Sequence, residues 1–131
     1  MADIKCIHSG AAPKAVGPYS QAVVHDGLMF ASGQIGLDPA SGQLVADNVI
    51  TQAGQVMKNL EAVLAAAGCA LSDILKVSIY LTDMGDFVSV NTLYAEWLGN
   101  HRPARATVAV AALPLDARIE MDVVARVGGK I

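Results

Sequence analysis

The segment RPARATVAVAALPLDARIEMDVVA, residues 102–125, contains two strand-like patterns separated by a turn. The first pattern is the apolar stretch Thr107–Ala112, and the second is the alternating stretch Ile119–Val127. Leu113–Asp116 lies between them and includes Pro114 and Asp116, residue types that are typical of turns. The segment therefore predicts two neighbouring strands at the C-terminal end of the fold.

Two charged residues in this segment suggest chemistry. With a turn centred on Pro114 and Leu115, Glu120 is expected opposite Ala109 and on the same face as Arg105. That register leaves Arg105 and Glu120 about 13 Å apart along the sheet, at roughly 3.3 Å per residue. Long side chains, a bulge or a contact between subunits would have to close this gap.

A guanidinium can hold a carboxylate through two parallel hydrogen bonds, and a glutamate can take a proton from water. Arg105 and Glu120 together therefore suggest a binding clamp beside a base. Taken singly, each residue has another interpretation. Arg105 could lie at a strand end in solvent or in an ion pair, and Glu120 could be an edge charge paired with Arg118 or a lysine.

The N-terminal part predicts a β-hairpin within Ser20–Gln34, because Asp26 and Gly27 lie between two apolar runs and suit a two-residue turn. This turn places Val24 opposite Met29. It also makes Tyr19 and Ser32 diagonal neighbours on one face.

The middle of the chain predicts two amphipathic helices with a strand between them. Counting an uncertain first strand, the expected order is β-β-β-α-β-α-β-β, an α+β fold with one mixed sheet and both helices packed on one face. The further elements are the strand Ile4–His8, the helix Asn48–Ala67, the strand Ile74–Leu81 and a helix from about Asp86 to Leu98.

The other face of this sheet has no cover from the chain. Its expected residues are too mixed for a core and too apolar for a surface in full contact with water, so a second subunit is expected to cover it. They are Lys76, Ser78 and Tyr80 with the series Arg105, Thr107 and Ala109.

Length and composition limit the classes of function. A chain of 131 residues predicts a single domain spanning residues 1–131, and 53% hydrophobic with only 16% charged residues favours burial against another subunit. The net charge of -3 leaves little to neutralise phosphates, so nucleic acid is not an expected partner.

The remaining residue types suggest neither a metal nor a membrane. Cys6, Cys69 and the three histidines lack metal-ligand spacing, and Gly33 and Gly36 do not form a dinucleotide-binding motif. The chain has no apolar run of about 20 residues and no basic-plus-apolar leader. Cytoplasmic location with free thiols is the expectation.

Three segments in this order resemble the RidA family, also called the YjgF or reactive-intermediate deaminase family. They are AVGPYSQA at residues 15–22, FASGQIG at residues 30–36 and the segment 102–125 quoted above, and the resemblance runs from about Ile7 to Val127. It implies a chorismate-mutase-like fold, homotrimers with clefts between subunits, and catalysis without a cofactor.

The resemblance also implies an activity: hydrolysis of 2-imino and enamine acids, such as 2-iminopropanoate and 2-iminobutanoate, to 2-oxo acids and ammonia. Arg105 would hold the substrate carboxylate and Glu120 would activate water. Substrate-binding roles are implied for Tyr19, Ser32, Gly33, Thr107 and Asn91. Many relatives have cysteine at the position of Thr107, so thiol-dependent chemistry is not expected here.

Other interpretations remain open at this point. Tyr19 and Ser32 could be packing residues, and Asn91 an exposed helix residue. The chain could be a non-catalytic sensor or chaperone-like protein that binds 2-oxo acids, in which case Arg105 is needed and Glu120 is not. It could be a deaminase of larger imines with a roomier pocket. The acidic charge argues against an RNA-cleaving or translation-inhibiting role.

Overall fold

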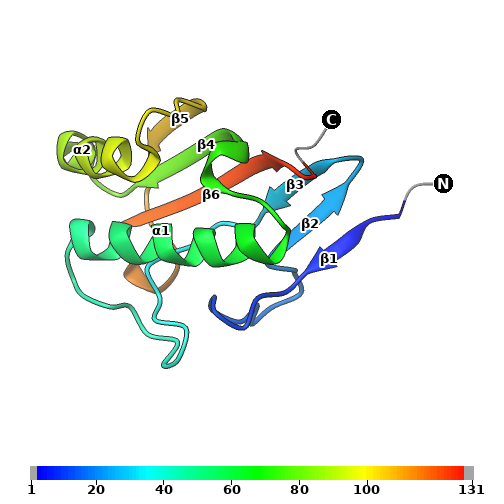
Figure 1. The fold of residues 1–131 in the computed structure, drawn as a ribbon. Coiled ribbons are helices and arrows are strands. Elements are labelled where there is room, and N and C mark those ends of the chain that lie inside the picture. Colours follow the sequence, from blue (N-terminus) through cyan, green and yellow to red (C-terminus); the bar gives the residue numbers. More distant parts are fainter. Residues whose placement is uncertain (1–2, 129–131) are drawn as a thin grey trace.

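The computed structural model describes residues 3–128, which form one six-stranded sheet with two α-helices (Figure 1). The strands lie in the order β1-β2-β3-β6-β4-β5. The predicted order of elements along the chain is confirmed. The elements are β1 Lys5–Ile7, β2 Ala22–His25, β3 Leu28–Ala31, α1 Val49–Ala66, β4 Ile74–Leu81, α2 Phe87–Leu98, β5 Ala104–Ala109 and β6 Ile119–Arg126, with short 3-10 helices at Leu71–Asp73, Met84–Asp86 and Pro114–Asp116.

The hairpin of β2 and β3 has the predicted turn and register. Asp26 and Gly27 have φ angles of +50° and +75°, as a tight two-residue hairpin turn requires. Val24 pairs with Met29. Beyond the paired strands, the backbone N–H of Ser32 donates to the carbonyl of Gln21 at 2.9 Å, so the hairpin extends toward Gly33.

Helix α1 agrees with the predicted helix to within one residue at each end. Asn48 is its N-cap, and the Asn48 side chain accepts a hydrogen bond from the backbone N–H of Thr51 at 2.8 Å. Gly68 follows the C-cap with a φ of +78°, a left-handed conformation that favours glycine and ends the helix.

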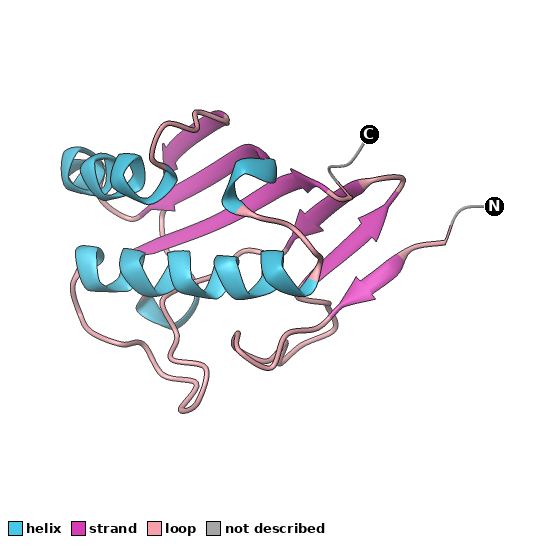
Figure 2. Ribbon diagram, in the orientation of Figure 1, coloured by secondary structure: helices cyan, strands magenta, loops and turns pink. Residues whose placement is uncertain are grey.

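Both helices cover the same face of the sheet, as predicted (Figure 2). Val77, Ile79 and Leu81 of β4 belong to the core cluster with the helices and are at most 2% exposed. The alternate residues of β4 therefore point to the opposite, uncovered face. One of them, Tyr80, donates a hydrogen bond to the Asp122 carboxylate of β6 at 3.1 Å.

The prediction for β5 was wrong in its bounds and in its neighbour. The strand spans Ala104–Ala109 rather than Thr107–Ala112, and it pairs in parallel with β4 at the edge of the sheet. The residues after Ala109 leave the sheet and reach the 3-10 helix Pro114–Asp116. β5 pairs with one side of β4 and β6 pairs with the other side, so β5 and β6 do not form the hairpin that their closeness in sequence suggested.

Strand β6 lies in the middle of the sheet, antiparallel to both β3 and β4. Glu120 is therefore level with Tyr80 of β4, not with Ala109 as predicted. Arg105 is level with Val77, whose side chain faces the helices. Residues paired across neighbouring strands point to the same face of the sheet. Arg105 therefore lies on the face that the helices cover and Glu120 on the uncovered face, so the prediction that they share a face was wrong.

The same register corrects the expected composition of the uncovered face. Arg105, Thr107 and Ala109 alternate along β5 on the side of the helices, and only the Lys76, Ser78 and Tyr80 series of β4 lies on the uncovered side.

Candidate active site

Glu120 is a half-buried carboxylate on the uncovered face of β6. Burial raises the pKa of this carboxyl above its usual value, and the nearby negative charge of Asp122 raises it further. A carboxylate with a raised pKa is a stronger base than an ordinary glutamate. Glu120 is thus suited to taking a proton from water near neutral pH.

Gly33 lies directly against Glu120. The backbone of the next residue, Gln34, exchanges two hydrogen bonds with Met121, at 2.8 and 3.1 Å, and these bonds hold the segment beside β6. A Cβ atom at position 33 would lie 2.8 Å from Cδ of Glu120 and 3.1 Å from Cγ. A side chain at this position would make the flexible Glu120 side chain turn away, so glycine lets the carboxylate keep its place.

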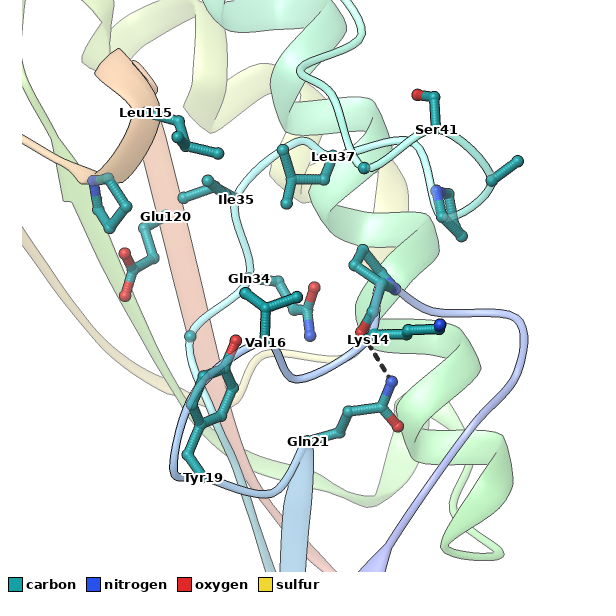
Figure 3. Close-up of a pocket in the computed structure, with 16 residues that line it drawn as sticks. Lys14, Val16, Tyr19, Gln21, Gln34, Ile35, Leu37, Ser41, Leu115 and Glu120 are labelled. Atoms are coloured by element: carbon teal, nitrogen blue, oxygen red, sulfur yellow. Dashed lines mark hydrogen bonds between the residues drawn. The ribbon is translucent and has the colours of Figure 1, made fainter.

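Glu120 and Gly33 line a cavity of about 490 Å³ that is mostly apolar (Figure 3). The N-terminal loop, the segment after β3 and the 3-10 helix before β6 form its walls. Tyr19, which is 53% exposed, lines the same cavity. In Figure 3 the Tyr19 ring lies on the side of Glu120, and Lys14 lies across the cavity. Apolar side chains at the walls include Val16, Ile35, Leu37 and Leu115.

Ser32 does not join this group. Its hydroxyl donates a hydrogen bond to the backbone carbonyl of Ser20 at 2.6 Å, and the residue lines a separate hollow with Phe30 on β2 and β3. Ser32 therefore holds the end of the hairpin that leads to Gly33, and its hydroxyl is already engaged.

Arg105 is a residue of β5, and its side chain extends to α2, where three residues contact the guanidinium. Nη1 donates a hydrogen bond to the side-chain carbonyl of Asn91 at 2.6 Å. The guanidinium carbon lies 4.9 Å from the centre of the Tyr94 ring and 5.6 Å from that of Phe87, within the range of cation–π contacts. Arg105 takes part in none of the ion pairs found among residues 3–128.

These contacts give Asn91 a different place from the one expected. Asn91 binds the arginine that was expected to bind the substrate carboxylate. The aromatic partners Phe87 and Tyr94 were not among the predicted site residues. Their spacing of four and three residues around Asn91 puts all three on one helical face, and this signal was available in the sequence.

A second cavity, of about 400 Å³, is lined by Asn91, Tyr94, Arg102 and Arg105 among others. Two buried hydroxyls, that of Tyr94 in the wall of this cavity and that of Thr107 on β5, have no hydrogen-bond partner among the described residues. Burial raises the pKa of the Tyr94 phenol, while the charges of Arg105 and Arg102 act to lower it. This phenol therefore stays protonated at neutral pH and can donate a hydrogen bond.

The predicted site residues thus fall into two groups. We call Glu120, Gly33 and Tyr19 the carboxylate half, and Arg105, Asn91 and Thr107 the guanidinium half. The carboxylate half lines a cavity on one side of the sheet, whereas Arg105 of the guanidinium half contacts α2 on the other side. One chain does not bring the two halves together.

Within residues 3–128, no three His, Cys, Asp or Glu side chains are grouped in a way that could hold a metal ion. None of the helices in the same range is both long and apolar enough to span a membrane.

Comparison with known proteins identifies the relatives of this fold. The chain is 51% identical to the protein DfrA of Myxococcus xanthus, covering 92% of this chain and 94% of the relative. It is 47% identical to a 2-iminobutanoate/2-iminopropanoate deaminase of Mus musculus, covering 92% and 90%. The crystal structure of E. coli TdcF with bound serine matches with a TM-score of 0.88 at 37% identity, covering 93% and 98%. The family model described as endoribonuclease L-PSP matches residues 9–127, and the chain therefore belongs to this family, the RidA or YjgF family.

Proposed function

We propose that this protein is a hydrolytic deaminase that converts 2-imino acids, and the enamines from which they form, to 2-oxo acids and ammonia. The observation that carries the proposal is the half-buried Glu120 carboxylate at the edge of an apolar cavity. Relatives named 2-iminobutanoate/2-iminopropanoate deaminase, 44–47% identical over 92% of this chain, support the same reaction.

In the proposed reaction, Glu120 orients a water molecule and accepts one of its protons as the oxygen attacks the imine carbon. The C=N double bond becomes a single bond and Glu120 returns the proton to the nitrogen, which leaves a neutral carbinolamine. Glu120 then takes the hydroxyl proton and delivers it to the nitrogen, so that ammonia leaves as the C=O bond forms. An imine is already electrophilic, so the reaction needs neither a covalent nucleophile nor a cofactor.

Arg105 would hold the α-carboxylate of the substrate through two parallel N–H groups. Asn91 and the rings of Phe87 and Tyr94 restrict the orientation of the Arg105 guanidinium before the substrate arrives, which favours binding. Backbone N–H groups near Gly33 and Thr107 would add donors. The ring of Tyr19 would close one side of the cavity.

A complete site requires two copies of the chain, because the two halves lie on opposite faces of one sheet. We propose a homotrimer in which the guanidinium half of one subunit meets the carboxylate half of its neighbour. The uncovered face of the sheet and the exposed apolar side chain of Phe30, 45% exposed, support such an assembly.

One observation favours a second candidate. The cavity of about 490 Å³ falls within the range of pockets that bind drug-sized ligands and exceeds what the ethyl group of 2-iminobutanoate fills. The protein could instead act on imines with larger apolar side chains. The RNA-cleaving activity in the family's description finds no support in the charge of -3.

The test is a coupled assay. A purified threonine dehydratase generates 2-iminobutanoate in solution, and the appearance of 2-oxobutanoate is followed with and without this protein. We expect a faster rate that increases linearly with its concentration. Equal rates would contradict the deaminase and leave a binding protein. An imine formed from leucine by an amino-acid oxidase, assayed beside it, tests the second candidate.

A further inference from the structure

The hydroxyl of Tyr94 is a polar group without a use inside the chain. Tyr94 lies on α2 and is 6% exposed, and its oxygen is buried with no hydrogen-bond partner among residues 3–128. Burial of an unpaired hydroxyl lowers the stability of a folded protein. A phenylalanine would fill the same space without that cost. The hydroxyl therefore lowers the stability of the free chain, and a ligand that binds it must displace the side chains that cover the oxygen.

The surroundings of Tyr94 indicate what that would be. The ring lies 4.9 Å below the guanidinium carbon of Arg105, and both residues line the cavity of about 400 Å³. Arg102 lines the same cavity, and its Nη1 is anchored to the carbonyls of Gly99 and His101 at 2.6 and 2.8 Å. A neutral phenol and two guanidiniums provide hydrogen-bond donors and positive charge, which suit an anion.

We propose that Tyr94 is a further ligand-binding residue, whose hydroxyl donates a hydrogen bond to a carboxylate oxygen of the 2-imino or 2-oxo acid held by Arg105. The inference rests on the proposed function, because it takes Arg105 as the carboxylate clamp. Tyr94 then contributes twice, since its ring supports the guanidinium and its hydroxyl contacts the same anion.

Tyr94→Phe tests the hydroxyl alone, because the ring remains. Two measurements are needed on the same preparation: calorimetric titration with 2-oxobutanoate, and thermal unfolding without ligand. A hydrogen bond to a charged group contributes enough that we expect about tenfold weaker binding. The melting temperature of the ligand-free variant should be equal to or higher than that of the wild type, because no internal hydrogen bond is lost. Weaker binding without lower stability is the signature of a ligand-binding hydroxyl.

Thr92→Val is the matched control. It removes a hydroxyl from the same helix, one that bonds the Val88 carbonyl at 3.2 Å in an exposed position. We expect 2-oxobutanoate to bind this variant as it binds the wild type. Tyr94→Leu, which also removes the ring under Arg105, should bind more weakly than Tyr94→Phe.

The outcomes separate this inference from the proposed function. Unchanged binding by Tyr94→Phe, with or without a lower melting temperature, would overturn the role of the hydroxyl while leaving the Arg105 clamp intact. If the wild type binds no 2-oxobutanoate, or if Arg105→Ala binds it as well as the wild type does, the clamp itself is wrong, and the inference about Tyr94 is overturned together with it.

Discussion

The two halves of the site are held by different forces. In the guanidinium half, Arg105 has named partners: a hydrogen bond to Asn91 and two aromatic rings. In the carboxylate half, Glu120 has no comparable partner among the described residues. Partial burial and the charge of Asp122 raise its pKa, and Gly33 leaves space for the carboxylate. The proposed carboxylate clamp is therefore fixed in place before any ligand arrives, whereas partial burial raises the pKa of the proposed base.

Glu120→Gln should cause the largest effect, because glutamine keeps the size and hydrogen bonding of the side chain but cannot accept a proton. We expect turnover in the coupled assay to fall by about 10²- to 10⁴-fold while 2-oxobutanoate binding is retained. Full activity would show that solvent water suffices without a base. Loss of binding as well would make Glu120 a structural residue and remove the distinction between the two halves.

Arg105→Lys, a change in the guanidinium half, should weaken ligand binding, whereas Glu120→Gln should leave binding unchanged. Lysine keeps the positive charge but cannot offer two parallel N–H groups or stack flat on the rings of α2. We expect the affinity for 2-oxobutanoate and the kcat/KM to fall together, by about 10- to 100-fold. Wild-type affinity in the calorimetric titration would exclude Arg105 from the carboxylate site.

The proposal that two different subunits supply the two halves of each site can be tested by mixing two variants, each lacking one half. Arg105→Ala and Glu120→Gln subunits are denatured together in equal amounts and refolded. If each site takes its halves from different subunits, about a quarter of the sites in a randomly mixed ring regain both wild-type residues, so about a quarter of the activity should return. Each variant refolded alone is the control. A mixture no more active than the controls would contradict a shared site.

Gly33→Ala should have a smaller effect, confined to the carboxylate half. The new methyl group would occupy the space next to Glu120, and the flexible side chain must turn away from the cavity. Misplacing a catalytic group by about 1 Å can cost about a hundredfold in rate, and because Glu120 retains freedom to rotate we expect about tenfold lower kcat. Gly10→Ala is the matched control, since a Cβ at Gly10 meets nothing within 4 Å. Equal rates for the two variants would show that the contact with Gly33 does not position Glu120.

The sequence was sufficient for the parts of the fold that local patterns determine. The turn at Asp26 and Gly27 determined the register of its hairpin, and the apolar period together with Asn48 and Gly68 located α1. These signals act over a few residues, so the sequence contains them directly.

The pairing of β5 depended on distant residues and was not predicted. Its neighbour is β4, which precedes it by a whole helix, and the turn at Pro114–Asp116 gave no sign that the chain crosses to the middle of the sheet. A wrong neighbour also places side chains on the wrong face, so Arg105 and Glu120 were expected on one side. The residues of the candidate site were identified by motif, but their division into two halves required the three-dimensional structure.

The smallest expected effect is on stability, and it tests whether partial burial raises the pKa of Glu120. Burial raises the pKa of Glu120 in the folded state above its value in the unfolded chain, so the folded state binds the proton more tightly. Glu120 loses its proton as the pH rises from below its pKa in the unfolded chain to above its pKa in the folded protein. Over this range the folded wild type becomes less stable than a variant with a residue at position 120 that does not titrate.

Glu120→Gln should therefore melt at a higher temperature than the wild type at neutral pH. The difference should shrink as the pH falls through the raised pKa of Glu120, because protonation removes the buried charge from the wild type as well. Glu96→Gln, a change at an exposed position on α2, is the matched control. If Glu120→Gln melts at a lower temperature at neutral pH, the charged form of Glu120 stabilises the fold. The carboxylate would then have a partner, such as a cation from a neighbouring subunit, and both halves of the site would be held by direct contacts.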